Sequence, residues 1–349
     1  MPKMVNKNMV TLARETRGYT QKKLAELIEI SQGSMSKIEQ GLCLVPDDVL
    51  EKLSKSLDFP IEFFFEPEYI YPPSSPFHRK RASLQKKIQA QIEAEANIRR
   101  IHINKLLKSA EIVDTKIIHE DIDNLGLSPA ESASKIRYYW KLPKGPIENV
   151  TTVLENFGII IAYCDFKSQL LDGFSFCVDD NHPIIFINSN APNDRIRFTL
   201  SHEVGHIIMH RIPTPEMEKE ANDFAAEFLM PSNEIKQHLY EPTLEKLAGL
   251  KRYWKVSIAS LIYRAKSLKT ITYNQERYLW TQYNAAGYRR KEPVELPKET
   301  PSIIQDLINL HLNDLGYSEE ELSKILLSNT DTFVDLYMKK RLRVVKNYK

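Results

Sequence analysis

The stretch from Ser201 to His210 contains a His-Glu-x-x-His motif, a pattern of residues that can bind a metal ion and activate water. His202 and His206 are four residues apart, so in a helix their side chains lie one turn apart on the same face. Their imidazole nitrogens could bind one Zn²⁺ at about 2.0–2.1 Å. Glu203 could then accept a proton from a zinc-bound water, whose pKa the metal lowers to roughly 7. The spacing therefore predicts a hydrolytic zinc site with Glu203 as the general base.

The residues before the motif favour a buried helix that follows a strand. Residues 183–188 (PIIFIN) are short, apolar and rich in β-branched residues, which is typical of a buried strand. Asn193 and Asp194 are of the types that cap helix N-termini, and an apolar face follows them through Ile196 and Leu200. The alternative is a surface helix with two incidental histidines, since the motif alone is only moderately specific.

Catalytic zinc usually keeps three protein ligands and leaves its fourth position to water, so a third ligand is needed. The next predicted helix, residues 216–230, places on one face Glu218, Ala221, Asn222, Ala225 and Leu229. The small residues would let this helix lie close to the zinc helix, with Asn222 able to hydrogen-bond a zinc ligand. We predict Glu218 as the third ligand and keep Glu220 as the alternative. Glu220 and Glu227 lie on a different face, which we expect to meet solvent.

His210 lies one further turn beyond His206. In metzincins the second histidine of the motif is followed by a glycine after three residues and a histidine after six, whereas His210 follows after four. At this spacing it would be too far from a metal held by His202 and His206. We interpret His210 as structural, because buried histidines usually satisfy hydrogen bonds.

Two segments together resemble the ImmA/IrrE family of metallopeptidases. The first, residues 195–210, contains the His-Glu-x-x-His motif, and the second, residues 218–231, reads Glu-x-x-Ala-Asn-x-Phe-Ala-Ala-Glu-Phe-Leu-Met-Pro. The similarity extends over about residues 173–268. Known members of the family cut DNA-binding repressors and so release transcription, which the resemblance implies as an expectation for this chain.

The same resemblance implies a role for each residue of the site. His202, His206 and Glu218 would be the zinc ligands, and Glu203 would be the general base. The expected cofactor is Zn²⁺, and a Mn²⁺ form is also compatible with this donor set.

Residues 1–66 are expected to form a unit of short helices. The first helix is predicted over residues 4–17, and Thr20 and Ser31 are predicted to cap the next two. Gly41 is predicted to end the third helix. Short helices joined by a tight turn match helix-turn-helix geometry, in which the second helix of the pair enters the major groove.

Within this unit, residues 20–25 (TQKKLA) and 30–41 (ISQGSMSKIEQG) resemble the phage-repressor (XRE) type of helix-turn-helix. The resemblance implies four DNA contacts, at Gln21, Gln32, Ser34 and Lys37. Gln21 would contact a phosphate, whereas the other three would face base edges or the backbone, because Gln can bond adenine with both side-chain atoms and Lys suits phosphate or guanine.

The unit departs from the XRE pattern at Glu29, where the family usually has glycine in the turn. A non-glycine residue at positive φ costs about 1 kcal/mol, and a carboxylate near DNA repels phosphate. Helical units of this kind also serve protein–protein docking, so docking is the alternative to DNA binding.

A proline-rich linker over residues 67–76 leads into a basic segment, residues 78–108. Apolar residues at helical spacing, such as Ile88 and Ile92, predict a long helix there. Its basic face is either simply solvated or adds phosphate contacts beside the helix-turn-helix.

The peptidase half is expected to contain a small sheet ahead of the zinc helix, with strands at residues 158–162, 173–178 and 184–188. A substrate peptide could add to the edge of this sheet as an extra strand. Tyr163 and His182 are candidates for stabilising the oxyanion, a role that stays open.

These elements predict an α+β fold class with four regions. They are an all-α helix-turn-helix domain (1–66), a linker and basic helix (67–110), a zincin-like metallopeptidase domain with a small sheet (111–285) and a helical C-terminal region (286–349). Residues 283–301 are polar and contain prolines, so we expect a loop there.

The composition limits the class of protein. A length of 349 residues is enough for two or three domains with cores of their own. The net charge of +2 indicates no general affinity for nucleic acid, and three cysteines without regular spacing indicate neither a disulfide framework nor a zinc ribbon. No apolar run approaches 18 residues and no apolar signal region is present, so we expect a cytoplasmic protein without membrane contact.

The sequence thus predicts a zinc-dependent endopeptidase fused to a DNA-binding domain, with a repressor that carries a helix-turn-helix, or the chain itself, as the substrate. The alternative is a DNA-binding regulator whose protease-like half senses or docks a partner without cutting it. The intact triplet of His202, Glu203 and His206 favours the enzyme, because a non-cutting domain has no need of a general base.

Overall fold

The structure, a computed structural model, describes residues 3–68, 70, 85–110, 126–176, 182–210 and 212–338. The chain divides into two compact units. Unit 1 comprises Met1–Pro72, Leu84–Ile112 and Ile303–Lys349, and unit 2 comprises Pro73–Ser83 and Val113–Ser302. Most of unit 2 therefore lies, in sequence, between two segments of unit 1.

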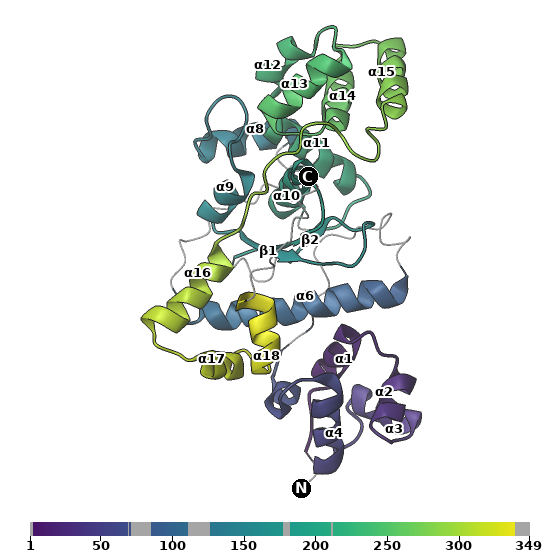
Figure 1. Cartoon of the computed structure of the whole chain (residues 1–349), viewed down its shortest axis with the longest axis vertical. Helices are drawn as coiled ribbons and strands as arrows, with labels where there is room; N and C mark the ends of the chain where they lie inside the picture. The colour runs from purple at the N-terminus through teal and green to yellow at the C-terminus, as the bar shows by residue number, and fades with distance from the viewer. Residues whose placement is uncertain are drawn as a thin grey trace, which may run out of the picture. The chain divides into compact units, whose positions relative to one another are not determined.

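The N-terminal part of unit 1 is a group of short helices (Figure 1). They are α1 (Lys7–Thr16), α2 (Gln21–Leu27), α3 (Gln32–Gln40), α4 (Asp47–Leu57) and the 3₁₀ helix η1 (Ile61–Phe65). The side chains of Thr20 and Ser31 accept hydrogen bonds from the backbone N–H groups of Lys23 and Ser34, and Gly41 ends α3 at a φ of 72°. The predicted caps are confirmed, and the apolar faces of these helices share one core.

A long helix and the C-terminal helices complete unit 1. They are α6 (Lys86–Leu107), α16 (Ile303–Asn309) with its continuation η3 (Leu310–Asp314), α17 (Glu319–Ile325), and α18 (Thr330–Phe333) with its continuation η4 (Val334–Met338). Ala94, Ile98 and Ile101 of α6 pack in the same core as α1 to α4, and so does Leu327. Leu106, near the end of α6, packs on the C-terminal helices, which are yellow in Figure 1. The N-terminal helices thus share their core with two later segments of the chain.

The prediction that the basic face of the long helix meets solvent or phosphate is wrong for Arg100 and Lys105. The Arg100 guanidinium lies 3.3 Å from a carboxylate oxygen of Glu68, and its side chain is only 3% exposed. The Lys105 ammonium donates to Glu66 at 2.8 Å. Buried charges need such partners, because moving a charged group out of water without a partner costs much free energy. The basic run at residues 78–81 lies outside the described residues.

Unit 2 contains a three-stranded sheet formed by β1 (Ile160–Cys164), β2 (Gly173–Phe176) and β3 (Ile184–Asn188). The strand order is β1-β3-β2, with β3 parallel to β1 and antiparallel to β2. Every residue of β3 is buried, which accounts for its continuous apolar run. All three predicted strands are present, but β1 begins and ends two residues later than predicted, because residues 158 and 159 are not part of it. Residues 177 and 178 lie outside the described part of the chain.

Eight α-helices are described in unit 2. They are α8 (Pro129–Tyr139), α9 (Val150–Asn156), α10 (Asn193–Met209), α11 (Met217–Leu229), α12 (Ser232–Ile235) with the 3₁₀ helix η2 (Lys236–Leu239), α13 (Leu244–Trp254), α14 (Ile258–Ser267) and α15 (Tyr273–Ala285). With one small sheet among so many helices, the α+β fold class is confirmed. Among the described residues, no helix has the length and apolar character needed to cross a membrane.

Helix α10, which carries the His-Glu-x-x-His motif, lies directly against α11. A Cβ atom at Gly205 of α10 would lie 3.2 Å from the ring of Phe224 and 3.3 Å from the Cα atom of Ala221, both on α11. A side chain at position 205 would therefore be in tight contact with α11. The predicted close approach of these helices through small residues is confirmed.

Candidate metal centre

Helices α10 and α11 bring His202, His206 and Glu218 together. One ligand atom from each lies within 4.8 Å of the other two. The two histidine Nε2 atoms are 3.0 Å apart, and the Glu218 carboxylate oxygens lie 3.4 Å from Nε2 of His206 and 3.7 Å from Nε2 of His202. Both histidines are buried, whereas the Glu218 side chain is 42% exposed. The cluster therefore opens to solvent on the Glu218 side.

These three donors fit a catalytic zinc ion. With bonds of about 2.0–2.1 Å and tetrahedral angles, two ligand atoms lie about 3.3 Å apart. The separations of 3.0, 3.4 and 3.7 Å agree with this value. Two imidazoles and one carboxylate also leave a fourth position for water, as catalytic rather than structural zinc sites do. The same nitrogen and oxygen donors suit other divalent metals, Mn²⁺ included.

Glu203 lies between the two histidines in sequence but is not part of this donor group. Its side chain is fully buried, and the Ser175 hydroxyl on β2 donates to its Oε2 atom at 2.8 Å. This contact ties the edge strand β2 to the carboxylate. Ser175 was not predicted as part of the site, although a polar residue between Phe174 and Phe176 in a buried strand was the signal for it.

Each histidine of the cluster has a partner on its other ring nitrogen. Nδ1 of His202 lies 3.1 Å from the side-chain oxygen of Asn222, as the helical face predicted. Nδ1 of His206 lies 3.0 Å from Nδ1 of His210, whose Nε2 lies 2.9 Å from a carboxylate oxygen of Glu220. His210 is thus outside the donor group but in direct contact with one of its members, a contact that the sequence analysis missed.

The expectation that Glu220 and Glu227 meet solvent is wrong for Glu227 and only partly right for Glu220. Glu227 is 4% exposed, forms an ion pair with Arg264 of α14 and accepts a hydrogen bond from the backbone N–H of Ser232. Glu220 is engaged by His210 and its side chain is 24% exposed. The periodicity of α11 by itself could not show that another helix supplies a buried arginine.

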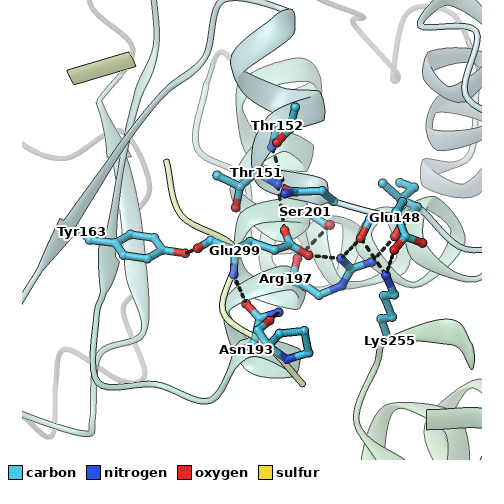
Figure 2. A network of polar contacts seen from close by, with 12 residues as sticks. Glu148, Thr151, Thr152, Tyr163, Asn193, Arg197, Ser201, Lys255 and Glu299 are labelled. Atoms are coloured by element: carbon cyan, nitrogen blue, oxygen red, sulfur yellow. Dashed lines mark hydrogen bonds and ion pairs between the residues drawn. The ribbon is translucent and has the colours of Figure 1, made fainter. Parts of the chain in front are cut away.

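Residues 286–302, which we call the strap, form no helix or strand, as predicted, but they hold α10 in place (Figure 2). Arg197 of α10 is fully buried and forms an ion pair with Glu299 of the strap. The Glu299 carboxylate also accepts the backbone N–H of Thr151 at 2.9 Å. Asn193, at the start of α10, donates to the backbone oxygen of Pro297 at 2.6 Å. The strap therefore fixes the part of α10 that precedes the metal ligands.

A second buried network holds the first turn of α10. Lys251 of α13 forms ion pairs with Asp194 of α10 and with Glu292 of the strap. Burial by itself lowers the pKa of Lys251, but the hydrogen bonds to both carboxylates outweigh burial, so its pKa is raised. Glu292 also accepts the backbone N–H groups of Ile258 and Ala259 at the start of α14.

The two candidates for the oxyanion contact backbone oxygens of unit 2. The Tyr163 hydroxyl donates to the backbone oxygen of Glu299 at 2.6 Å, and burial raises its pKa to about 12 (Figure 2). His182 contacts the backbone oxygen of Gly158 at 3.2 Å. Both side chains thus have partners within unit 2, and their role at the oxyanion stays a prediction.

The predicted DNA contacts lie in unit 1. Gln32, Ser34 and Lys37 are exposed on α3. Gln21 is partly buried; its amide nitrogen donates to Glu39 at 2.7 Å, and its oxygen accepts from the Gln32 amide at 3.4 Å. These bonds hold α2 and α3 together with the α3 side chains pointing outward, as a recognition helix requires.

The turn between α2 and α3 has the strained residue that the sequence predicted. Glu29 has a φ of 60°, in the region that favours glycine. Its carboxylate accepts a hydrogen bond from Lys52 of α4 at 2.6 Å, which lowers the pKa of Glu29. A lysine beside this carboxylate reduces the repulsion of phosphate expected from Glu29 by itself.

Metal content provides a direct test of the cluster. Protein purified without added metal is expected to contain about one divalent transition metal per chain, with zinc as the expected ion. The His202→Ala/His206→Ala double variant is expected to contain none, because Glu218 cannot hold the ion by itself. Elemental analysis of both proteins measures this, and undiminished metal in the double variant would rule out the site.

Each of the two units contains a segment that matches a known protein family. Residues 154–266 match a peptidase family described as the IrrE N-terminal-like domain, a range that contains the whole cluster of donors. Residues 11–64 match a helix-turn-helix family.

Among characterised proteins, the chain is similar to the radiation response metalloprotease IrrE of Deinococcus radiodurans. The two are 36% identical over 116 residues, which cover 28% of this chain and 35% of that protein. The similarity thus spans about a third of the relative.

Proposed function

Because the chain carries an IrrE N-terminal-like peptidase domain and a helix-turn-helix domain, we propose that it is a zinc endopeptidase that controls transcription by cutting a DNA-binding repressor. The observation that carries this proposal is the arrangement around α10. Two histidines and Glu218 converge on one point, and the buried Glu203, which is outside this donor group, lies on α10 with the histidines. A structural metal site would have no use for Glu203.

The residues of the site suit peptide hydrolysis. Zinc, when bound, would lower the pKa of a coordinated water to about 7 and polarise the scissile carbonyl. Glu203 would take the proton as that water attacks and would pass it to the leaving amine. The Ser175 hydroxyl keeps the carboxylate in a fixed orientation through its 2.8 Å hydrogen bond.

The strand order suggests how a substrate peptide would be held. β2 is at the edge of the sheet and is also the strand whose Ser175 contacts Glu203. A peptide that paired with this edge would run beside the general base in an extended conformation. The four residues of β2 are buried, so such a peptide must displace the chain that covers them.

The contacts within unit 1 favour a partner protein over the chain itself as substrate. The Gln91 amide of α6 donates to the backbone oxygen of Thr16 at 3.1 Å, and Asn329 donates to Asp58 at 2.6 Å. A cut within residues 71–84 would leave these contacts, and the shared core, intact. Self-cleavage there would therefore not release the helix-turn-helix, whereas cleavage of a separate repressor would release its DNA-binding part.

Mass spectrometry of newly formed N-termini tests this proposal. Cells that express the wild type are compared with cells that express Glu203→Gln, and the peptides of XRE-type repressors are followed in both. A fragment of such a repressor that forms only with the wild type supports the proposal. Equal fragments with both proteins, or none with either, would leave the non-cutting DNA-binding regulator as the better account.

DNA binding gives a separate prediction, to be measured on the whole chain because the helix-turn-helix core includes α6 and Leu327. Gln32→Ala is expected to relax specificity for the operator by about 1–3 kcal/mol, since it removes a base contact. Lys37→Ala is expected to weaken binding to all sequences alike if Lys37 contacts phosphate. Selection from a random DNA library, followed by binding titrations, measures both; failure of the wild type to enrich any sequence would favour the docking role.

A further inference from the structure

The buried His210 side chain and the partly exposed Glu220 form a pair directly behind the metal ligand His206. Helix α10 ends at Met209, and His210 leaves it with a φ of −115° and a ψ of 92°, while its backbone N–H still bonds the His206 oxygen at 3.0 Å. This change of direction places the His210 ring against that of His206, with their Nδ1 atoms 3.0 Å apart. On its other side, Nε2 of His210 lies 2.9 Å from Glu220 of α11. The His210 side chain is only 4% exposed.

The two contacts are compatible with a single arrangement of protons once a metal is bound. A ligand that binds a metal through Nε2 carries its proton on Nδ1, so His206 must donate to His210. His210 must then accept at Nδ1 and carry its own proton on Nε2. From there it donates to the Glu220 carboxylate. In this chain of hydrogen bonds His206 donates to His210, and His210 donates to the carboxylate of Glu220.

The other histidine ligand, His202, is oriented in a simpler way than His206. His202 is held through Nδ1 by the amide oxygen of Asn222, which in turn donates to the backbone oxygen of Glu218. A neutral amide is sufficient to orient that ring. His206 is instead held by His210, which in turn contacts the carboxylate of Glu220 on α11.

We propose that His210 and Glu220 are positioning residues for the metal, with Glu220 acting through His210 to fix the ring of His206. This inference depends on the proposed metal centre. Acceptors that orient a ligand histidine and raise its basicity typically contribute 10- to 100-fold to metal affinity. Removal of His210 is therefore expected to weaken zinc binding by a factor in this range.

The experiment measures metal binding rather than peptide cleavage. Zinc affinity is determined by competition with a chromogenic chelator for the wild type, His210→Ala, His210→Gln and Glu220→Gln. Lys219→Ala is the matched control, because Lys219 is an exposed neighbour of Glu220 on α11. The visible spectrum of the Co²⁺-loaded proteins reports the geometry at the metal, and thermal unfolding of the metal-free proteins reports the fold.

We expect His210→Ala to lose about 10- to 100-fold in zinc affinity and to change the Co²⁺ spectrum, with metal-free proteins of similar thermal stability. Glu220→Gln should lose less, and His210→Gln should recover part of the loss, because its amide oxygen can accept from His206 as Asn222 does from His202. Lys219→Ala should match the wild type.

Unchanged zinc affinity and an unchanged spectrum in His210→Ala would overturn the inference while leaving the peptidase proposal in place. Loss of thermal stability without loss of affinity would show that His210 is only structural. Absence of zinc binding in the wild type would instead overturn the proposed metal centre itself.

Discussion

Replacement of Glu203 by glutamine is expected to abolish most of the peptidase activity while leaving the metal in place. The carboxylate is outside the donor group of His202, His206 and Glu218, so the variant should keep one metal per chain. Glutamine fills nearly the same volume in this fully buried position but cannot accept a proton at neutral pH. Loss of a general base typically lowers kcat by about 10²–10⁴-fold.

Kinetics and elemental analysis of the same preparation check this prediction. Ser175→Ala is the useful companion variant, because it removes the hydrogen bond to Glu203 and keeps the base itself. Its activity should fall much less than that of Glu203→Gln. If Glu203→Gln lost its metal, or kept wild-type turnover, Glu203 would not be the general base.

The second large effect is a loss of stability when Glu299, the buried partner of Arg197, is replaced by alanine. The Arg197 side chain is fully buried and Glu299 of the strap is 8% exposed, so Glu299→Ala leaves an uncompensated charge inside unit 2. Breaking a buried ion pair in this way typically costs about 3–5 kcal/mol. Urea unfolding followed by tryptophan fluorescence measures the change, because Trp140, Trp254 and Trp280 all belong to unit 2.

The strap provides its own control for this measurement. Glu295 forms an ion pair with Lys291 in which both side chains are 76% exposed, so Glu295→Ala should leave stability unchanged within error. Replacing Arg197 and Glu299 together by apolar residues should recover much of the loss, because no buried charge then remains. Equal stability of Glu299→Ala and the wild type would mean that the strap does not hold α10.

What the sequence could predict was local. Helix starts at Thr20 and Ser31 follow from short-range capping chemistry, and both caps are present in the structure. The spacing of His202 and His206 is also local, since a helix alone brings them together. The cap expected from Asn193 and Asp194 is wrong, because Pro192 is the N-cap residue of α10 and no side chain caps this helix.

The wrong assignments concern charges whose partners come from distant segments. Glu227 was expected to meet solvent, yet its partner Arg264 lies 37 residues away. Glu299 lies in the predicted loop, but its ion pair with Arg197, 102 residues away, could not be predicted. A buried charge and an exposed charge look the same in a sequence, because the partner that makes burial tolerable is set by tertiary packing.

The discontinuous make-up of unit 1 also constrains when this DNA-binding domain can finish folding. Asp58 and its partner Asn329 are 271 residues apart in the chain. At about 5–20 residues per second, a ribosome needs about 14–54 s to pass from one to the other. The helix-turn-helix is synthesised first but shares its core with Leu327, so it completes that core only after the whole of unit 2 has been made. Translation thus delivers all of unit 2 before unit 1 is complete, even though the helix-turn-helix comes first in the sequence.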